Sequence, residues 1–168
     1  MIPTPLPRVV IDTQVWVFIF EHELLEDFAS KQPYRAILEA LEAGRFIPVF
    51  TLETLEELRY MLTKSQDVAK RFNVDTKLAD YFVDAISAAD VGAVMIEIQD
   101  PPFVSSDPDD DYFIEAAVVA RAWYLVSEDA DLHERAVVLH LNAHQVRVLY
   151  PQQFRKLVDP QREGPPTT

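Results

Sequence analysis

Acidic residues gather in four separate segments of the chain, each beside a predicted strand end or helix start. These residues are Asp12, Glu56, Glu57, the aspartates of 107–111, Asp129 and Asp131. If the fold brings them together, two carboxylates about 4 Å apart repel by about 4 kcal/mol at an effective dielectric constant of about 20. A hard divalent cation with oxygen ligands reverses that repulsion. The pattern therefore predicts a metal-dependent enzyme.

Short apolar segments alternate with helical segments along the chain. The apolar segments, rich in Val, Ile, Phe or Tyr, predict strands near 8–12, 46–50, 94–98, 123–127 and 146–150. The segments between them predict helices near 15–29, 33–43, 51–63, 75–91, 109–122 and 131–142. This alternation favours a three-layer α/β/α fold with a five-stranded parallel sheet. Sites in such sheets form at the carboxyl ends of strands, which is where the acids lie.

Composition limits the other classes of function. The 168 residues predict one domain over 8–157, with flexible termini at 1–7 and 158–168. There is no cysteine, which excludes disulfides and thiolate chemistry and fits a cytoplasmic protein. Only three glycines are present, without a nucleotide-binding glycine motif. No apolar run is long enough to span a membrane.

The charge balance is acidic, with 15 Lys and Arg against 28 Asp and Glu and a formal net charge of −13. That balance argues against nucleic-acid binding, which usually requires a basic surface. The basic residues are uneven, however, because five of them fall within 59–77: Arg59, Lys64, Lys70, Arg71 and Lys77. This group is either a solvated helical face or an arm that contacts phosphates beside the site.

Asp12 is the strongest single candidate because it directly follows a buried strand. Its alternative role is to cap the next helix, although Thr13 could serve as the cap instead. On the 51–63 helix, the helical period places Glu56 and Glu57 on opposite flanks of the leucine face. The period does not choose between these two glutamates, and a solvated acidic face near the helix start is equally compatible.

The aspartates of 107–111 cannot all be metal ligands, because at least two should cap or begin the following helix. Asp111 is favoured because the helix fixes its direction, and Asp110 is second. Asp129 and Asp131 follow a strand and precede another helix, so one of them is expected to be a cap. Glu128 adds a further charge outside the expected ligand set.

Taken in order, these segments resemble the PIN-domain ribonucleases, in particular the VapC-like toxins of toxin–antitoxin pairs. The resemblance covers about residues 8–157 and rests on the ordered set rather than on any one motif. The matching segments are VIDT at 10–13, LEELR at 55–59, DPDDD at 107–111 with Phe113, YLVSEDADL at 124–132 and VRVLYPQQF at 146–154.

The resemblance implies an endoribonuclease that uses Mg²⁺ or Mn²⁺. By position it implies catalytic roles for Asp12, Glu57, Asp111 and Asp129, with Asp131 as a further metal ligand. Asp110 and Glu56 are the alternative ligands. Thr13, Ser127, which replaces a usual Thr, and Arg59 are the candidate substrate contacts.

The resemblance also implies partners: an RNA substrate, a small antitoxin protein and a second copy of the chain in a homodimer. Two departures from the family pattern are Gln14, which replaces a shorter Asn or Ser, and Glu128, which replaces a glycine. They motivate an alternative function, a catalytically degenerate PIN domain that serves as an interaction module. A receiver-like phosphoacceptor domain is a weaker alternative, because the second acid that it needs after the first strand is absent.

Overall fold

The computed structural model describes residues 5–24, 32–64, 75–101 and 103–159. Five parallel strands form one sheet in the order β3-β2-β1-β4-β5. The strands are β1 (Arg8–Ile11), β2 (Ile47–Phe50), β3 (Val94–Met95), β4 (Tyr124–Val126) and β5 (Arg147–Leu149). The chain runs outward from β1 to β2 and β3, and then crosses to β4 and β5 on the other side of β1. The switch point of the sheet therefore lies between β1 and β4.

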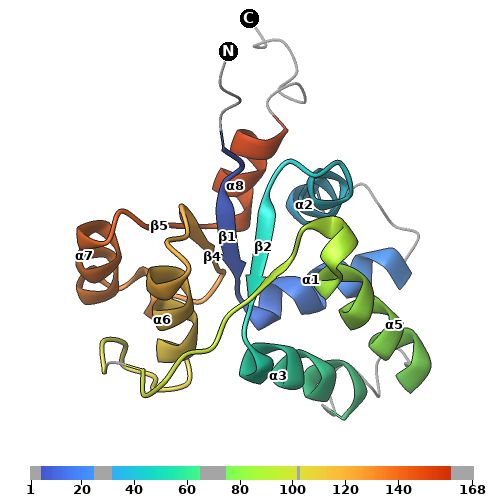
Figure 1. Cartoon of the computed structure of the whole chain (residues 1–168), viewed down its shortest axis with the longest axis horizontal. Helices are drawn as coiled ribbons and strands as arrows, with labels where there is room; N and C mark the ends of the chain where they lie inside the picture. Colours follow the sequence, from blue (N-terminus) through green and yellow to red (C-terminus); the bar gives the residue numbers. More distant parts are fainter. Residues whose placement is uncertain (1–4, 25–31, 65–74, 102, 160–168) are drawn as a thin grey trace, which may run out of the picture.

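Helices cover both faces of the sheet, as the sequence predicts. They are α1 (Thr13–Leu24), α2 (Gln32–Glu42), α3 (Leu52–Thr63), α5 (Thr76–Ser87), α6 (Asp111–Val119), α7 (Arg135–Ala143) and α8 (Pro151–Val158), with short 3₁₀ turns η1 (Ala89–Val91) and η2 (Asp131–His133). In Figure 1, α6 and α7 lie on one side of the strands, while α1, α2 and α5 lie on the other. The fold is thus a three-layer α/β/α sandwich.

Alternation of side chains along the strands divides the core into two clusters. Val9 and Ile11 of β1 belong to the cluster that includes α1, α2, α3, α5 and α8. Val10, between them, points to the cluster with α6 and α7. Successive residues of a strand face opposite sides, so apolar residues at all three positions require a sheet that is covered on both faces.

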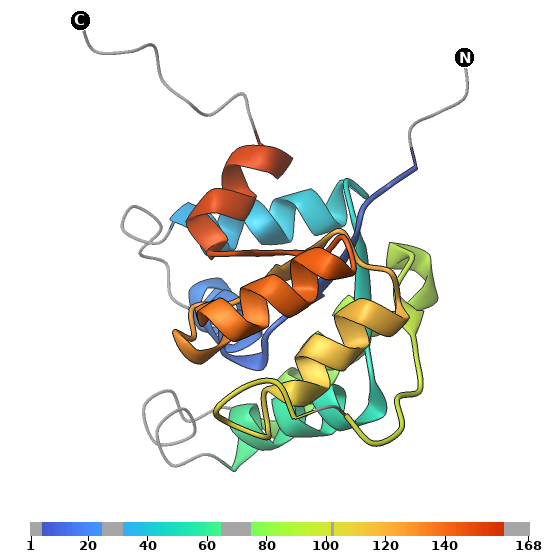
Figure 2. The same cartoon turned by 90° about the vertical axis from the view of Figure 1, so that its left-hand side faces the viewer.

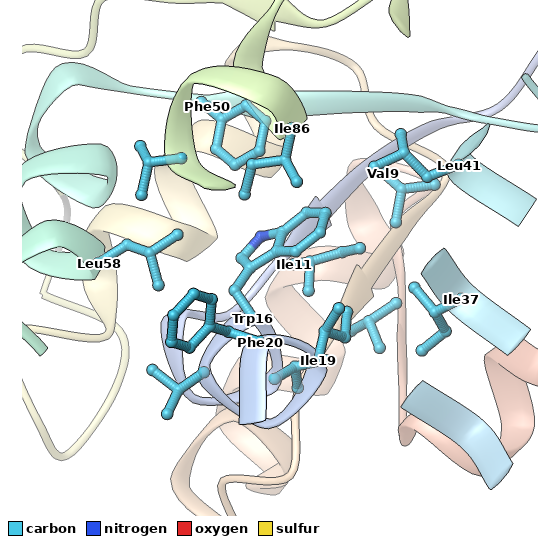
Figure 3. Packing of buried hydrophobic residues seen from close by; sticks show 14 of the residues in the cluster. Val9, Ile11, Trp16, Ile19, Phe20, Ile37, Leu41, Phe50, Leu58 and Ile86 are labelled. Atoms are coloured by element: carbon cyan, nitrogen blue, oxygen red, sulfur yellow. The ribbon is translucent and has the colours of Figure 1, made fainter. Parts of the chain in front are cut away.

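Trp16 is at the centre of the larger cluster, as Figure 3 shows. Its ring centroid lies 5.6 Å from that of Phe50 at the end of β2, and Trp16 itself is only 2% exposed. Leu55, Leu58 and Leu62 of α3 pack into the same cluster at helical spacing. This packing fixes the rotation of α1, which directly follows Asp12, and of α3, which carries Glu56 and Glu57.

The observed elements differ from the predicted ones mainly at their ends. The third strand contains only Val94 and Met95, shorter than the predicted 94–98. The fifth predicted helix begins at Asp111 rather than at 109, because 107–110 form turns. At the C-terminus, α8 extends to a buried Val158, one residue past the predicted domain end. The outer parts of the predicted tails, 1–4 and 160–168, lie outside the described residues.

Candidate active site

A polar cavity of about 510 Å³ opens at the carboxyl ends of β1 and β4. Its lining comprises Asp12, Thr13, Gln14, Phe18, Glu57, Met61, Asp107, Asp109, Asp110, Phe113, Glu128, Asp129 and Ala130. This is the switch point of the sheet, where the two central strands end side by side and their following chains diverge. Acids from all four predicted segments of the sequence therefore meet in one place.

Asp12 follows β1 directly and is 7% exposed. One carboxylate oxygen, Oδ1, accepts a long hydrogen bond of 3.3 Å from the Gln14 amide, and the other, Oδ2, accepts one of 2.6 Å from the Ser127 hydroxyl. Asp12 thus caps α1 and also lines the cavity, so the two predicted alternatives are compatible. Burial raises the pKa of this carboxyl above its ordinary value of 3.8, and the charge of Asp129 adds to that increase.

The structure does not bring Asp111, the favoured third acid, into the cavity. Asp111 is 1% exposed, and its carboxylate accepts hydrogen bonds from the amides of Val104 (3.1 Å) and Ser105 (2.8 Å). It therefore ties the chain before α6 to the first turn of that helix. The direction of a first-turn side chain is indeed fixed by the helix, but here that direction leads to the 104–105 backbone rather than to the other acids.

Asp110 takes the position in the cavity that was expected of Asp111. It is the N-cap residue of α6, but its side chain makes no capping hydrogen bond. Its Oδ2 atom is buried without a hydrogen-bond partner. Burial and the charges of Asp129 and Asp12 raise the pKa of Asp110 to about 7. Among the described residues, the Asp110 carboxylate therefore has no cationic partner that would stabilise its charge.

Asp129 and Asp131 complete an acidic cluster with Asp110. One carboxylate oxygen from each of the three lies within 4.8 Å of the others. Asp129 Oδ1 accepts the Asp131 amide at 2.9 Å, which orients the turn that follows β4. Ser127, fully buried, also accepts the Asp129 amide on its hydroxyl at 2.8 Å. The same serine therefore positions both Asp12 and Asp129.

The structure distinguishes between the two glutamates of α3. Glu57 lines the cavity and accepts a 2.8 Å hydrogen bond from the Thr13 hydroxyl. Burial raises its pKa above the ordinary value of 4.5, and the charges of Asp12 and Asp109 contribute. The side chains of both glutamates are exposed, but only Glu57 lines the cavity. Rotation of α3 on the core, with Leu55 and Leu58 inward, decides between them.

The three described members of the predicted basic group, Arg59, Lys64 and Lys77, do not line the cavity. The Arg59 guanidinium pairs with Asp84 at 2.6 Å and with Asp80 at 3.5 Å, so it joins α3 to α5. Lys64 and Lys77 are exposed. Lys70 and Arg71 lie outside the described residues.

Several residues that line the cavity were not predicted from the sequence to belong to the site. Asp107 and Asp109 lie in the turn before α6, and Asp107 Oδ1 accepts the Asp109 amide at 3.0 Å. Glu128 is held at the rim by the Tyr34 hydroxyl, which donates to it at 2.7 Å. Burial and, after it, the contact with Glu128 raise the pKa of Tyr34. A run of aspartates marks the loop as acidic, but no local pattern tells which of its members turn inward.

The donor set fits a hard divalent cation. All the converging ligands are carboxylate oxygens, which Mg²⁺ and Mn²⁺ prefer. Two further observations support the fit: the unpartnered, buried oxygen of Asp110 and the proximity of Asp110, Asp129 and Asp131. Among the described residues, no Lys or Arg lines this cavity to balance the charge. A cation bound here would lower the raised pKa values of the surrounding acids.

Fold and site together define an α/β protein with an acidic, metal-compatible crevice at the switch point of a parallel sheet. The family model for the PIN domain matches residues 8–131. The chain belongs to the PIN domain family, which has a nuclease fold. No protein with a curated description matches the sequence. Within the described part of the chain, every helix is too short or too polar to cross a bilayer.

Proposed function

We propose that this protein is an Mg²⁺- or Mn²⁺-dependent endoribonuclease. The observation that carries the proposal is the convergence of Asp12, Glu57, Asp110 and Asp129 from four separate segments on one cavity. Four carboxylates gathered in a cavity that no described Lys or Arg lines serve no evident purpose in folding. Membership in the PIN domain family supports nuclease chemistry.

Asp12, Asp110 and Asp129 are the proposed metal ligands, with Asp131 beside them. Asp12 presents Oδ2 from a fixed orientation, since Ser127 donates to that atom. Asp110 has an oxygen free of protein partners. Asp131 belongs to the same close cluster as Asp110 and Asp129. When bound, the cation would acidify a water molecule and neutralise charge on the phosphate.

The side chains then orient the reactants for hydrolysis. The oxygen of a water molecule forms a new bond to phosphorus while the bond to the leaving ribose oxygen breaks. Glu57 accepts the proton of that water, and the leaving oxygen takes a proton from solvent. Thr13 holds Glu57 in place through its 2.8 Å hydrogen bond.

We further propose that the enzyme is the toxin of a toxin–antitoxin pair and acts in the cytoplasm. An apolar cavity of about 390 Å³ between α1, α2 and α5 supports a protein partner. Tyr81 on its edge is 73% exposed, although it is a large aromatic residue. A small antitoxin with an amphipathic helix suits such a groove. Size-exclusion chromatography would show whether the chain forms a homodimer, whose second copy is the alternative occupant of this groove.

The decisive experiment measures cleavage of single-stranded and structured RNA with Mn²⁺ or EDTA. Wild type is expected to cleave only with Mn²⁺, and the variants Asp12→Asn and Glu57→Gln are expected to lose at least about a hundredfold in rate. Glu56→Gln is the matched control, because this neighbouring glutamate is exposed and outside the cavity. Equal activity of Asp12→Asn and wild type would refute the proposal.

A catalytically inactive PIN module is the competing function, since the unusual residues Gln14 and Glu128 both line the cavity. Calorimetric titration with Mn²⁺ separates the two functions. A nuclease requires saturable metal binding that Asp110→Asn weakens, whereas an interaction module has no need of such a site.

A further inference from the structure

A second cavity, of about 740 Å³, lies at the opposite end of β4 from the acidic site. Its lining comprises Val118, Arg121, Ala122, Trp123, His144 and Gln145. These residues come from the C-terminal ends of α6 and α7 and from the chain that leads into β4. Figure 2 shows α6 and α7 side by side, with their C-terminal ends together. None of the lining residues is acidic, in a chain whose net charge is −13.

Two lining residues have an unfavourable backbone conformation. Arg121 has φ 50° and Gln145 has φ 63°, and they are the positive-φ non-glycine residues of the described chain. Side chains disfavour this left-handed region, so helices usually place glycine there. Both residues end their helices with the same hydrogen-bond pattern. In each case the amide of the next residue donates a hydrogen bond to a carbonyl of the helix. Ala122 donates to Ala117 at 2.8 Å, and Val146 donates to Leu141 at 2.9 Å.

At two other turns of the chain, the residue with positive φ is a glycine. After α2, Gly44 has φ 62° and the next amide, that of Arg45, bonds to Ala40 at 2.9 Å. After η1, Gly92 has φ 75° in the equivalent position. Thus glycine occupies this position at two turns, whereas a long polar side chain occupies it at the two turns that border one cavity. Strain that persists at a concave site indicates function there.

The side chains indicate what the cavity binds. Trp123 is 42% exposed and offers an aromatic face, and Arg121 offers a guanidinium that pairs with no carboxylate among the described residues. Gln145 offers both a donor and an acceptor. The His144 ring centroid lies 5.0 Å from that of His140, whose Nε2 is buried without a hydrogen-bond partner. A planar, anionic ligand with polar edges matches this combination.

We propose that this cavity binds a nucleotide, with its base stacked on Trp123, its phosphate at Arg121 and a base edge at Gln145. The nucleotide is either free or part of a single RNA strand, because both present the same chemistry. The proposal stands independently of the nuclease activity, since Trp123 and the acidic residues lie at opposite ends of β4.

Tryptophan fluorescence provides the test. The chain has two tryptophans, and Trp16 is buried, so ligand-dependent quenching reports on Trp123. Full-length protein in EDTA is titrated with AMP, GMP, a single-stranded hexaribonucleotide and a hexaglutamate peptide. We expect saturable quenching by a nucleotide ligand, about tenfold weaker or more in Arg121→Gly. Saturation by AMP or GMP assigns a free nucleotide, and saturation by the hexaribonucleotide alone assigns an RNA strand.

Stability measurements provide a second, independent readout. Arg121→Gly and Gln145→Gly should raise the melting temperature while they weaken binding, because glycine relieves the left-handed conformation. Gly44→Gln is the reciprocal control. A Cβ at Gly44 meets nothing within 4 Å, so the variant suffers no clash. Its φ of 62° is nevertheless unfavourable for a side chain, so the variant should lower the melting temperature and leave quenching unchanged. Asp12→Asn should also leave quenching unchanged.

Several results would overturn the assignment. Absence of saturable quenching by every nucleotide ligand would refute it, as would an unchanged affinity in Arg121→Gly. Quenching by hexaglutamate but not by nucleotides would give the cavity to an acidic protein partner instead. A lower melting temperature in both glycine variants would remove the argument from backbone strain.

Discussion

The Ser127 hydroxyl donates a 2.6 Å hydrogen bond to Asp12 Oδ2, across 115 positions of sequence. This bond joins the carboxyl ends of β1 and β4, the two strands that flank the switch point of the sheet. Ser127 also accepts the Asp129 amide on the same hydroxyl oxygen. A single buried serine therefore connects two acids of the candidate metal site.

Replacement of Ser127 by alanine should weaken metal binding about tenfold to a hundredfold, because the residues that orient metal ligands commonly have effects of that size. The free energy of unfolding should fall by about 1–2 kcal/mol, since the Asp129 amide and Asp12 each lose a partner. Calorimetry with Mn²⁺ and urea denaturation measure the two effects. Ser87→Ala is the control, because the Ser87 hydroxyl also donates a hydrogen bond, a partly buried one to the Val83 carbonyl, but lies on α5. Equal metal affinity in both variants would contradict this role for Ser127.

The neighbours Asp110 and Asp111 should respond oppositely to replacement by asparagine. Asp111→Asn should lower the free energy of unfolding by about 1–3 kcal/mol, because its carboxylate accepts two loop amides in a buried position. The affinity of the Asp111→Asn variant for the metal should change less than about threefold. Asp110→Asn should weaken metal binding at least about tenfold, because it removes a ligand, without comparable loss of stability. If Asp111→Asn weakened metal binding more than Asp110→Asn, Asp111 rather than Asp110 would be the metal ligand.

The metal-free protein should lose stability as the pH rises through the neutral range. The pKa of Asp110 is raised from 3.8 to about 7, so between these values the folded state keeps a proton that the unfolded state has released. The stabilisation from this proton is present below 3.8 and is lost as the pH rises through about 7. The raised pKa values of Asp12 and Glu57 act in the same direction.

Urea denaturation in EDTA between pH 5 and pH 8 measures this dependence. The Asp110→Asn variant should have a flatter profile than wild type. Saturating Mg²⁺ should stabilise the wild type more at pH 8 than at pH 6, because the cation competes with protons for the carboxylates. A metal-free protein whose stability rises toward pH 8 would contradict the expected sign.

Arg59 should contribute to the contact between α3 and α5 rather than to RNA binding. Its guanidinium already pairs with Asp84 and Asp80. Arg59→Gln should lower the free energy of unfolding by less than about 1 kcal/mol, since partly exposed ion pairs contribute little and are screened by salt. The Michaelis constant for RNA should change less than about threefold. A large increase in that constant with unchanged stability would restore the substrate contact predicted from sequence.

Much of the fold follows from local patterns. Continuous apolar segments such as 9–11 require a sheet covered on both faces, and helical spacing in α3 places Leu55, Leu58 and Leu62 inward. A carboxylate after a buried strand predicted the position of Asp12, because parallel strands bring their carboxyl ends to one edge. These inferences depend on periodicity and connection rules, which are properties of the sequence.

Tertiary structure alone decided which acids converge. Asp110 and Asp111 are adjacent and chemically identical, and only the path of 104–105, whose amides donate to Asp111, leaves Asp110 for the cavity. Likewise, the packing of Leu55 and Leu58 turns Glu57 toward Thr13. A helix start fixes a direction for each side chain, but what lies in that direction depends on distant segments of the chain. The sequence therefore determined the sheet and the edge at which the acids gather, while long-range packing determined the members of the site.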